Sequence, residues 1–145
     1  MIRIDNNVVI NRPVDQVFKF VANIENLPEW AGPVLEAKQT SVGPASVGTT
    51  QSQVGKFLGQ RLEISLEVTE HEPNKKISAK STSGPFPIEV HYTFEPVAEG
   101  TRMTMGRNVD PRGFFKLAEP VIARMLKRQA ETDIGNLKDL LEAQA

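Results

Sequence analysis

The sequence contains no cysteine, and this absence excludes several kinds of site at once. Without thiols the chain can form neither a disulfide framework nor a thiolate zinc site, and it has no cysteine nucleophile. The absence fits a reducing compartment, so we expect a cytoplasmic protein. Histidine occurs only twice, which leaves few imidazole groups for acid–base chemistry near neutral pH.

An excess of charge of one sign and long apolar runs are also missing. The 17 Lys and Arg residues and the 18 Asp and Glu residues leave a formal net charge of -1, so no overall field attracts the chain to nucleic acid or to an anionic membrane. No window approaches the roughly 18 apolar residues of a membrane span, and residues 1–7 contain no apolar signal core. We expect no nucleic-acid partner and no integral membrane segment.

The length and composition are those of an ordinary globular domain. The chain has 145 residues, of which 39% are hydrophobic and 24% charged, enough apolar material for one core and too much for a disordered chain. It shows no internal repeats, low-complexity tracts or linkers. We therefore expect a single domain over residues 1–145.

The first third of the chain predicts a strand followed by two short helices. Residues 2–10 supply β-branched bulk, and Asn11-Arg12-Pro13 breaks that run. Val14, Val17, Phe18 and Val21 then recur at spacings of three and four, which indicates a helix with one buried face, Pro13 in its first turn and its end near Asn23. Residues 25–30 form another helical turn, which residues 31–33 end.

From residue 34 onward the hydrophobic period changes to two, which indicates consecutive antiparallel hairpins. The clearest strand alternates Leu62, Ile64, Leu66 and Val68 with polar neighbours. Residues 72–75, 83–85 and 99–100 supply turns, and Ile77, Ala79, Ile88, Val90, Tyr92, Phe94, Met103, Met105 and Val109 continue the alternation. Residues 47–54 are predicted as a strand only through their neighbours and the expected turn at 55–59.

After residue 113 the pattern predicts one long C-terminal helix. Apolar residues recur near a 3.6-residue period from Leu117 to Leu141, so a helix of nearly thirty residues and about 40 Å could cross the whole sheet. Strands and helices segregate along the chain, which favours an α+β class over a parallel α/β sheet.

Several segments resemble, in type and order, the START-like helix-grip superfamily, also called SRPBCC, and its polyketide cyclase/dehydrase and lipid-transport branch. They are residues 12–18, 26–30, 47–49, 84–87, 92–96 and 100–104, beginning with Arg12-Pro13-Val14-Asp15-Gln16-Val17-Phe18 and Asn26-Leu27-Pro28-Glu29-Trp30. The resemblance implies a seven-stranded curved antiparallel sheet wrapped around the C-terminal helix, with two short helices between strands 1 and 2. It also implies a cavity that in relatives holds lipids, sterols, polyketides, hormones or aromatic metabolites.

The resemblance identifies a fold, and a function does not follow from fold alone. Some members of the superfamily are cyclases or hydrolases, but it shares no catalytic motif, so no catalytic residue carries over to this chain. We expect no cofactor and no metal. A homodimer is compatible with the resemblance, although no residue of this sequence argues for one.

The candidate cavity wall consists of side chains on the gripping face of the sheet and on the helices. We predict Trp30, Leu66, Tyr92, Phe94, Met103, Met105, Arg107 and Met125 as ligand-cavity residues. Three of them are methionines, whose flexible thioethers adapt to varied apolar shapes. The alternative for each apolar member is plain core packing, because apolar stripes more often form a core.

Arg107 is the one charged candidate. It shares its parity with Met103, Met105 and Val109, so it faces the cavity if the strand runs unbulged to that point. A guanidinium there could hold a carboxylate or enolate oxygen. The alternative is that the strand has ended and Arg107 is solvated or paired with Asp110. Gln51 and Gln53 could add hydrogen bonds, but their parity is undecided.

Other polar residues give weaker indications. We predict His71, in the turn before Glu72, and His91, opposite in parity to Tyr92, as surface residues, and two histidines without a third ligand do not make a metal site. Asp133 is expected on the flank of the grip that the sheet forms around the helix. The basic residues Arg124, Lys127 and Arg128 are expected on its solvated outer face.

Three functional hypotheses remain open. The first is the binding or carriage of a small hydrophobic ligand that is lipid-like, polyketide-like or aromatic. The second is a cyclase, dehydratase or hydrolase acting on such a ligand, with Arg107 or Tyr92 polarising an oxygen. The third is a protein-interaction module whose cavity is filled by its own side chains.

Overall fold

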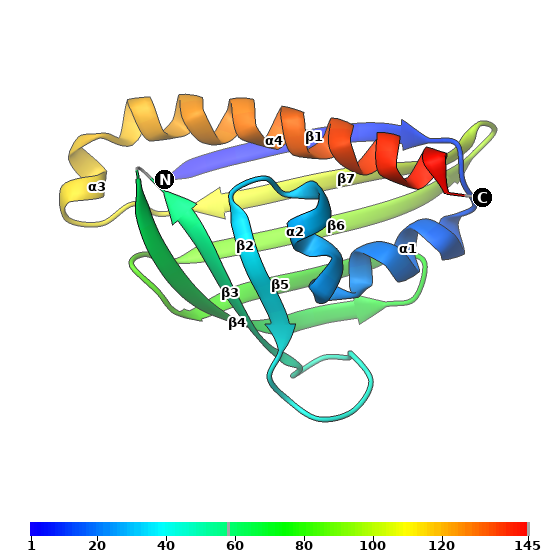
Figure 1. Cartoon of the computed structure of the whole chain (residues 1–145), viewed down its shortest axis with the longest axis horizontal. Helices are drawn as coiled ribbons and strands as arrows, with labels where there is room; N and C mark the ends of the chain where they lie inside the picture. Colours follow the sequence, from blue (N-terminus) through cyan, green and yellow to red (C-terminus); the bar gives the residue numbers. More distant parts are fainter. Residues whose placement is uncertain (58, 145) are drawn as a thin grey trace.

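The computed structural model describes residues 1–57 and 59–144 and contains one seven-stranded antiparallel sheet (Figure 1). Its strands are β1 (Ile2–Ile10), β2 (Val34–Gln39), β3 (Thr50–Phe57), β4 (Gln60–Glu72), β5 (Lys76–Ser83), β6 (Ile88–Val97) and β7 (Gly100–Val109). Strands β2 to β7 form a meander, and β1 pairs with β7 at the far edge. The predicted α+β helix-grip fold is confirmed.

The helices lie on one side of this curved sheet (Figure 1). The connection between β1 and β2 holds α1 (Val14–Ala22), the 3₁₀ helix η1 (Ile24–Asn26) and the short α2 (Leu27–Trp30). After β7 come α3 (Phe114–Leu117) and α4 (Glu119–Ala143), and α4 runs alongside β1. Among the described residues no helix is both long and apolar enough to span a membrane.

The C-terminal helix is shorter than the sequence predicts. In place of one helix of nearly thirty residues, the chain forms the four-residue α3 and the 25-residue α4. Ala118 separates them because its backbone, with φ of -97° and ψ of 12°, leaves the helical region. Pro120 then stands in the first turn of α4, where its missing N–H costs no hydrogen bond.

The core fills the space between the sheet and the helices. On α1 the buried residues are Val17, Phe18 and Val21, as the helical spacing predicts. Fully buried side chains of β7 and α4 complete this core, among them Met103, Met105, Ile122, Leu137 and Leu141. Burying side chains of this size stabilises a fold by about 1.5–3 kcal/mol each, so the packing of α4 against the sheet contributes substantially to stability.

Two strand boundaries differ from the sequence prediction. The strand predicted over residues 47–54 instead spans Thr50–Phe57. It begins later because Gly48 has a φ of 92°, which is outside the extended conformation of a strand. The turn predicted over residues 55–59 is wrong for residues 55–57, which belong to β3, and Leu58 lies outside the described residues.

The prediction that His71 is a surface residue in a turn is wrong. His71 lies within β4, where the pairing with β5 shifts register between Val68 and Glu70. Such a bulge reverses the alternation, so His71 lies on the same face of the sheet as Ile77. Its ring packs edge-on against Phe18 of α1, with 5.5 Å between the ring centroids.

Candidate ligand cavity

Two adjoining cavities lie between the sheet and the helices. The first has a volume of about 160 Å³, and its wall is mostly apolar, with Leu62, Ile64, Leu66, Ile88, Val90 and Leu126 among its lining residues. The second, of about 220 Å³, lies against α4 and is lined by Met125, Gln129 and Asp133 among others. Phe57 and Arg107 line both. The two cavities therefore meet at these residues.

The first cavity is large enough for an aromatic ring. Apolar cavities of roughly 150 Å³ stay dry and bind benzene or xenon. The first cavity of this protein has about that volume, and most of its wall is apolar, with Gln53, Lys56 and Arg107 among its polar lining residues. Together with the adjoining space toward α4, it can accommodate a larger apolar molecule whose polar group reaches Arg107.

Three phenylalanines from distant parts of the chain meet at the wall of the first cavity. The ring of Phe86 lies 6.0 Å from that of Phe57 and 5.2 Å from that of Phe115. Phe57 and Phe86 line the cavity directly. The sequence did not predict either residue as part of the cavity, although Phe86 lies within one of the segments that carry the resemblance. The contact between these rings depends on how β3, the β5–β6 turn and α3 pack together.

Arg107 is half-buried and lies on the cavity side of β7. The pairings of β7 with β1 and β6 contain no register shift, so the alternation of Met103, Met105 and Arg107 continues to Val109. Asp110 pairs with Arg112 at 2.8 Å, so the alternative pairing of Asp110 with Arg107 is not what the structure shows.

The guanidinium of Arg107 is incompletely satisfied. Its Nε is buried and has no hydrogen-bond partner among the described residues. Its terminal Nη2 contacts the sulfur of Met105 at 3.9 Å, a weak acceptor. A buried donor without a partner is costly, by about 1–3 kcal/mol, and is rare in folded proteins. Arg107 also hydrogen-bonds Tyr92, so it is its Nε that remains a donor without a partner among the described residues, on a cation that lines both cavities.

Asp133, predicted on the flank of the grip, is instead buried within it and lines the second cavity. It is only 2% exposed, because it shares a face of α4 with the buried Ala130 and Leu137, three residues before and four after it. Its Oδ1 accepts hydrogen bonds from the backbone N–H of Gly32 at 3.1 Å and from Nε2 of Gln129 at 2.7 Å. Both bonds therefore end on one carboxylate oxygen.

Burial raises the pKa of the Asp133 carboxyl above its usual value, although the hydrogen bonds from Gln129 and Gly32 and the charge of Arg107 partly oppose this. Burial likewise raises the pKa of the Tyr92 phenol, and the charge of Arg107 and its hydrogen bond with the phenol oppose this. Tyr92 is therefore a neutral hydroxyl at pH 7. The walls of the two adjoining cavities thus contain a cation in Arg107, a phenol in Tyr92 and, in Asp133, a carboxyl that holds its proton more tightly than usual.

Replacing Asp133 by Asn is expected to change how stability depends on pH. The relevant pH window begins at the normal carboxyl pKa of 3.8 and ends above the raised pKa of the folded state. Within this window the folded wild type binds more protons than the unfolded chain. The stability of the wild type therefore falls as pH rises through the window. An Asn side chain can still accept both bonds at its Oδ1 and does not ionise. The stability of Asp133→Asn relative to wild type should therefore rise through the window, as measured by urea denaturation across pH.

A matched control for this experiment is Asp139→Asn, which alters an exposed carboxyl of the same helix. A change in the pH profile that appears in Asp133→Asn and is absent from this surface variant would be attributed to the buried carboxyl. A wild-type profile that Asp133→Asn does not alter would contradict the raised pKa.

The structure brings together some of the predicted cavity residues. Leu66, Tyr92 and Arg107 line the first cavity, and Met125, which is 40% exposed, lines the second at its outer side. The others pack in the core around them: Trp30, Phe94, Met103 and Met105, each at most 6% exposed. Gln53, whose parity the sequence left undecided, also lines the first cavity. That any of these residues contacts a ligand stays a prediction.

Polar side chains on the face of the sheet opposite the cavities form hydrogen bonds with one another. His91 is half-buried, and its Nδ1 lies 2.9 Å from Oγ of Ser78. The Ser78 hydroxyl in turn donates a hydrogen bond to Glu70 at 2.9 Å. Ser78 and His91 have the opposite parity to Ile77 and Tyr92, so this network faces away from the cavities. The described part of the chain contains no group of three His, Asp or Glu residues that could hold a metal ion.

The family model described as polyketide cyclase / dehydrase and lipid transport matches residues 1–142. No curated protein matches the chain. Among solved structures, TTHA0849 from Thermus thermophilus is similar with a TM-score of 0.84 and 19% identity, over 97% of each chain. The Zhui aromatase/cyclase from Streptomyces sp. R1128 has a TM-score of 0.80 and 11% identity, over 97% of this chain and 93% of its own.

A further similar structure shows this fold within a longer chain. The di-domain aromatase/cyclase BexL from the BE-7585A biosynthetic pathway has a TM-score of 0.73 and 17% identity, and the match covers 96% of this chain and 46% of BexL. At these identities the likenesses establish the fold alone.

Proposed function

This chain belongs to the polyketide cyclase/dehydrase and lipid transport family, and from that membership we propose that it binds and carries a small hydrophobic ligand that bears an acidic or carbonyl oxygen. The observation that carries the proposal is the apolar cavity of about 160 Å³ beside a buried guanidinium nitrogen without a partner among the described residues. Apolar burial would supply most of the affinity, and Arg107 would orient the ligand through its oxygen.

Native mass spectrometry of the purified protein, followed by organic extraction, tests this proposal. A defined apolar molecule that co-purifies near stoichiometric occupancy would support binding and identify its chemical class. If the protein is empty, a panel of aromatic carboxylates, fatty acids and polyketide-like phenols should raise its thermal stability as a ligand-bound state would. An empty protein whose stability no member of the panel changes would overturn the proposal.

A variant with a filled cavity is the matched control. Val90 lines the first cavity from β6, so Val90→Phe places a ring inside it, at a cost of about 1–3 kcal/mol for overpacking. The same change at Val47, which is 63% exposed on the β2–β3 loop, adds a ring outside the cavity. Ligand binding should be lost in Val90→Phe and retained in Val47→Phe.

A second candidate function is catalysis on such a ligand, for which the position of Asp133 is the specific support. Its carboxyl lines the second cavity, which Arg107 also lines, so it could remove a proton next to a carbonyl that Arg107 polarises. The loss of water from an aryl β-hydroxyketone would test this role. Turnover by wild type that Asp133→Asn abolishes, with ligand binding intact, would favour the enzyme over the carrier.

The third hypothesis, an interaction module with a collapsed cavity, has less support. It expects the space between sheet and helix to be filled by side chains of the protein itself. The two cavities of about 160 and 220 Å³ do not match that expectation.

A further inference from the structure

Exposed apolar side chains gather where α3 meets α4, beside the second cavity. Leu117 is 86% exposed, Val121 57% and Met125 40%. The residues are four apart, and Val121 and Met125 share one face of α4. Met125 also lines the second cavity. This apolar strip therefore continues from the molecular surface into the cavity wall.

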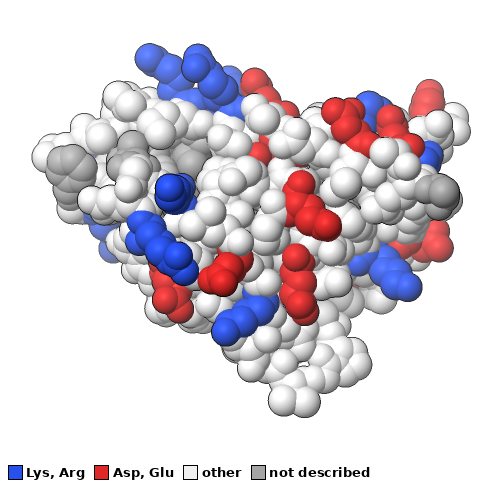
Figure 2. Space-filling view, viewed as in Figure 1, with Lys and Arg blue, Asp and Glu red and all other residues white. Residues whose placement is uncertain are grey.

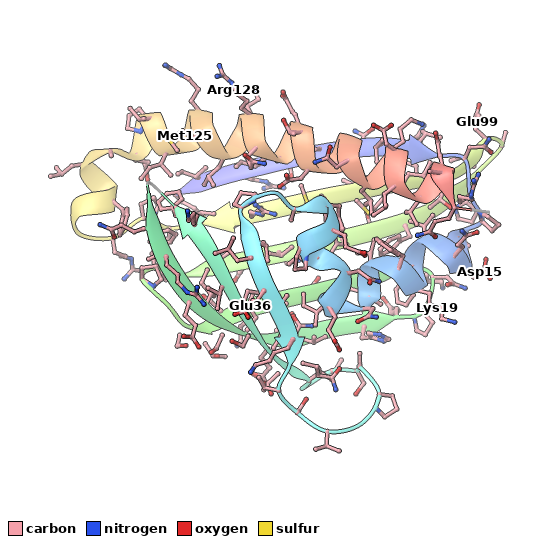
Figure 3. The ribbon with its side chains drawn as sticks, viewed as in Figure 1. Asp15, Lys19, Glu36, Glu99, Met125 and Arg128 are labelled. Atoms are coloured by element: carbon pink, nitrogen blue, oxygen red, sulfur yellow. The ribbon has the colours of Figure 1, made fainter. Side chains whose placement is uncertain are left out.

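Cations flank the strip. Arg124, Lys127 and Arg128 are exposed, and none forms an ion pair within the part of the chain that the structure describes. Figure 2 shows blue side chains standing out along the N-terminal half of α4, and Figure 3 shows Arg128 on the side of α4 that faces away from the sheet. The nearest acidic residues along the helix are Glu119, which contacts the Met1 amino group at 3.2 Å, and Glu131.

We propose that this α4 docking surface, formed by Leu117, Val121, Met125, Arg124, Lys127 and Arg128, binds anionic lipid membranes and aligns the second cavity with them. The proposal rests on the proposed function in one respect, that the cavity holds an apolar ligand to be taken up or released. Apolar side chains beside several cations are the combination that binds a membrane interface rich in anionic lipid. A ligand could then pass along Met125 between bilayer and cavity without crossing bulk water.

The observations favour a membrane over the other possible occupants of this surface. In a two-fold dimer built on the same strip, Arg124 and Arg128 of one copy would face the same cations of the other, and such like-charge contacts are unfavourable. An acidic protein would satisfy the cations but would give no reason for the strip to continue into an apolar cavity. The net charge of -1 does not oppose local binding, since a charge is screened beyond about 10 Å.

Co-sedimentation of the ligand-free protein with lipid vesicles tests the proposal. We expect binding to mixed phosphatidylcholine and phosphatidylserine vesicles, weaker binding to pure phosphatidylcholine vesicles, and a loss of affinity as salt rises. A cation near an anionic surface contributes roughly fivefold in affinity, so Arg124→Gln with Arg128→Gln should bind about 25-fold more weakly. Leu117→Ser with Val121→Ser should also weaken binding, because it removes the apolar contact.

Matched controls separate docking from general effects on the protein. Arg124→Lys with Arg128→Lys keeps both charges and should keep most of the affinity. Val42→Ser removes a fully exposed apolar side chain from the β2–β3 loop, away from α4, and should bind like wild type. All of these sites are on the surface, so circular dichroism should show folded variants.

The two proposals fail in different experiments. Vesicle binding is measured without ligand, so its absence, or equal binding by the Gln and Lys double variants, would overturn docking even where mass spectrometry finds a ligand. An empty cavity with intact vesicle binding would overturn ligand carriage and leave docking standing. Self-association in ultracentrifugation that Val121→Ser abolishes, without vesicle binding, would overturn docking in favour of a second copy at this surface.

Discussion

Arg107→Met is expected to stabilise the ligand-free protein and to weaken the binding of ligands that carry an acidic oxygen. Methionine has a similar length and no donor, so the variant removes the buried Nε that lacks a partner among the described residues. An unsatisfied buried donor costs about 1–3 kcal/mol, but the variant also loses the favourable interactions of Arg107 with Asp133 and Tyr92, so the free energy of unfolding should rise by less than that amount. A bound carboxylate would lose a charge-assisted hydrogen bond of about 1.5–3 kcal/mol, which is roughly tenfold to a hundredfold in affinity.

A pair of probe ligands isolates the role of the guanidinium. Titration calorimetry with 1-naphthoate should show the full loss of affinity in Arg107→Met, whereas naphthalene, which has no oxygen, should bind wild type and variant alike. Arg107→Lys keeps the charge but lacks the planar fork, so its affinity for 1-naphthoate should lie between the two. Equal binding of 1-naphthoate by wild type and Arg107→Met would remove Arg107 from the proposed site.

Replacing Gly100, which begins β7, by Ala is expected to destabilise the protein, in contrast to the stabilisation expected for Arg107→Met. Its φ of 139° is a conformation that side-chain-bearing residues rarely adopt, and an added Cβ would press on the carbonyl oxygen of Ile10 and lie 2.8 Å from the backbone nitrogen of Arg12. Both obstacles are backbone atoms that cannot move aside cheaply. Gly100→Ala should lower the free energy of unfolding by about 3 kcal/mol or more, measured by urea denaturation.

Gly135→Ala is the matched control for this prediction. Gly135 lies in the middle of α4, has helical rather than left-handed backbone geometry, and an added Cβ would meet nothing within 4 Å. Alanine there should stabilise the protein by about 0.5–1 kcal/mol. If both variants changed stability in the same direction, the close approach at Gly100 would not be the cause of its effect.

Two differences between sequence prediction and structure share a physical origin. The sequence predicts His71 as a surface residue, and a single register shift in β4 turns it toward Phe18. The sequence predicts Asp133 on the flank of the grip, and the packing of α4 against the sheet buries it beside Gly32. The spacing from Ala130 and Leu137 places Asp133 on the buried face of α4, but what His71 and Asp133 contact depends on how distant segments pack.

The sequence by itself determined the strands, the helices and the family, because hydrophobic periodicity and turn residues are local properties and six short segments in a fixed order identify this fold. It also indicated the direction of Arg107, since an unbulged strand keeps its alternation. Only the tertiary structure decided which side chains border open space. The meeting of Phe57 with Phe86, the burial of Asp133 and the lack of a partner for Arg107 Nε among the described residues depend on contacts between residues far apart in the chain. Periodicity assigns a residue to a face, whereas packing decides what that face encloses.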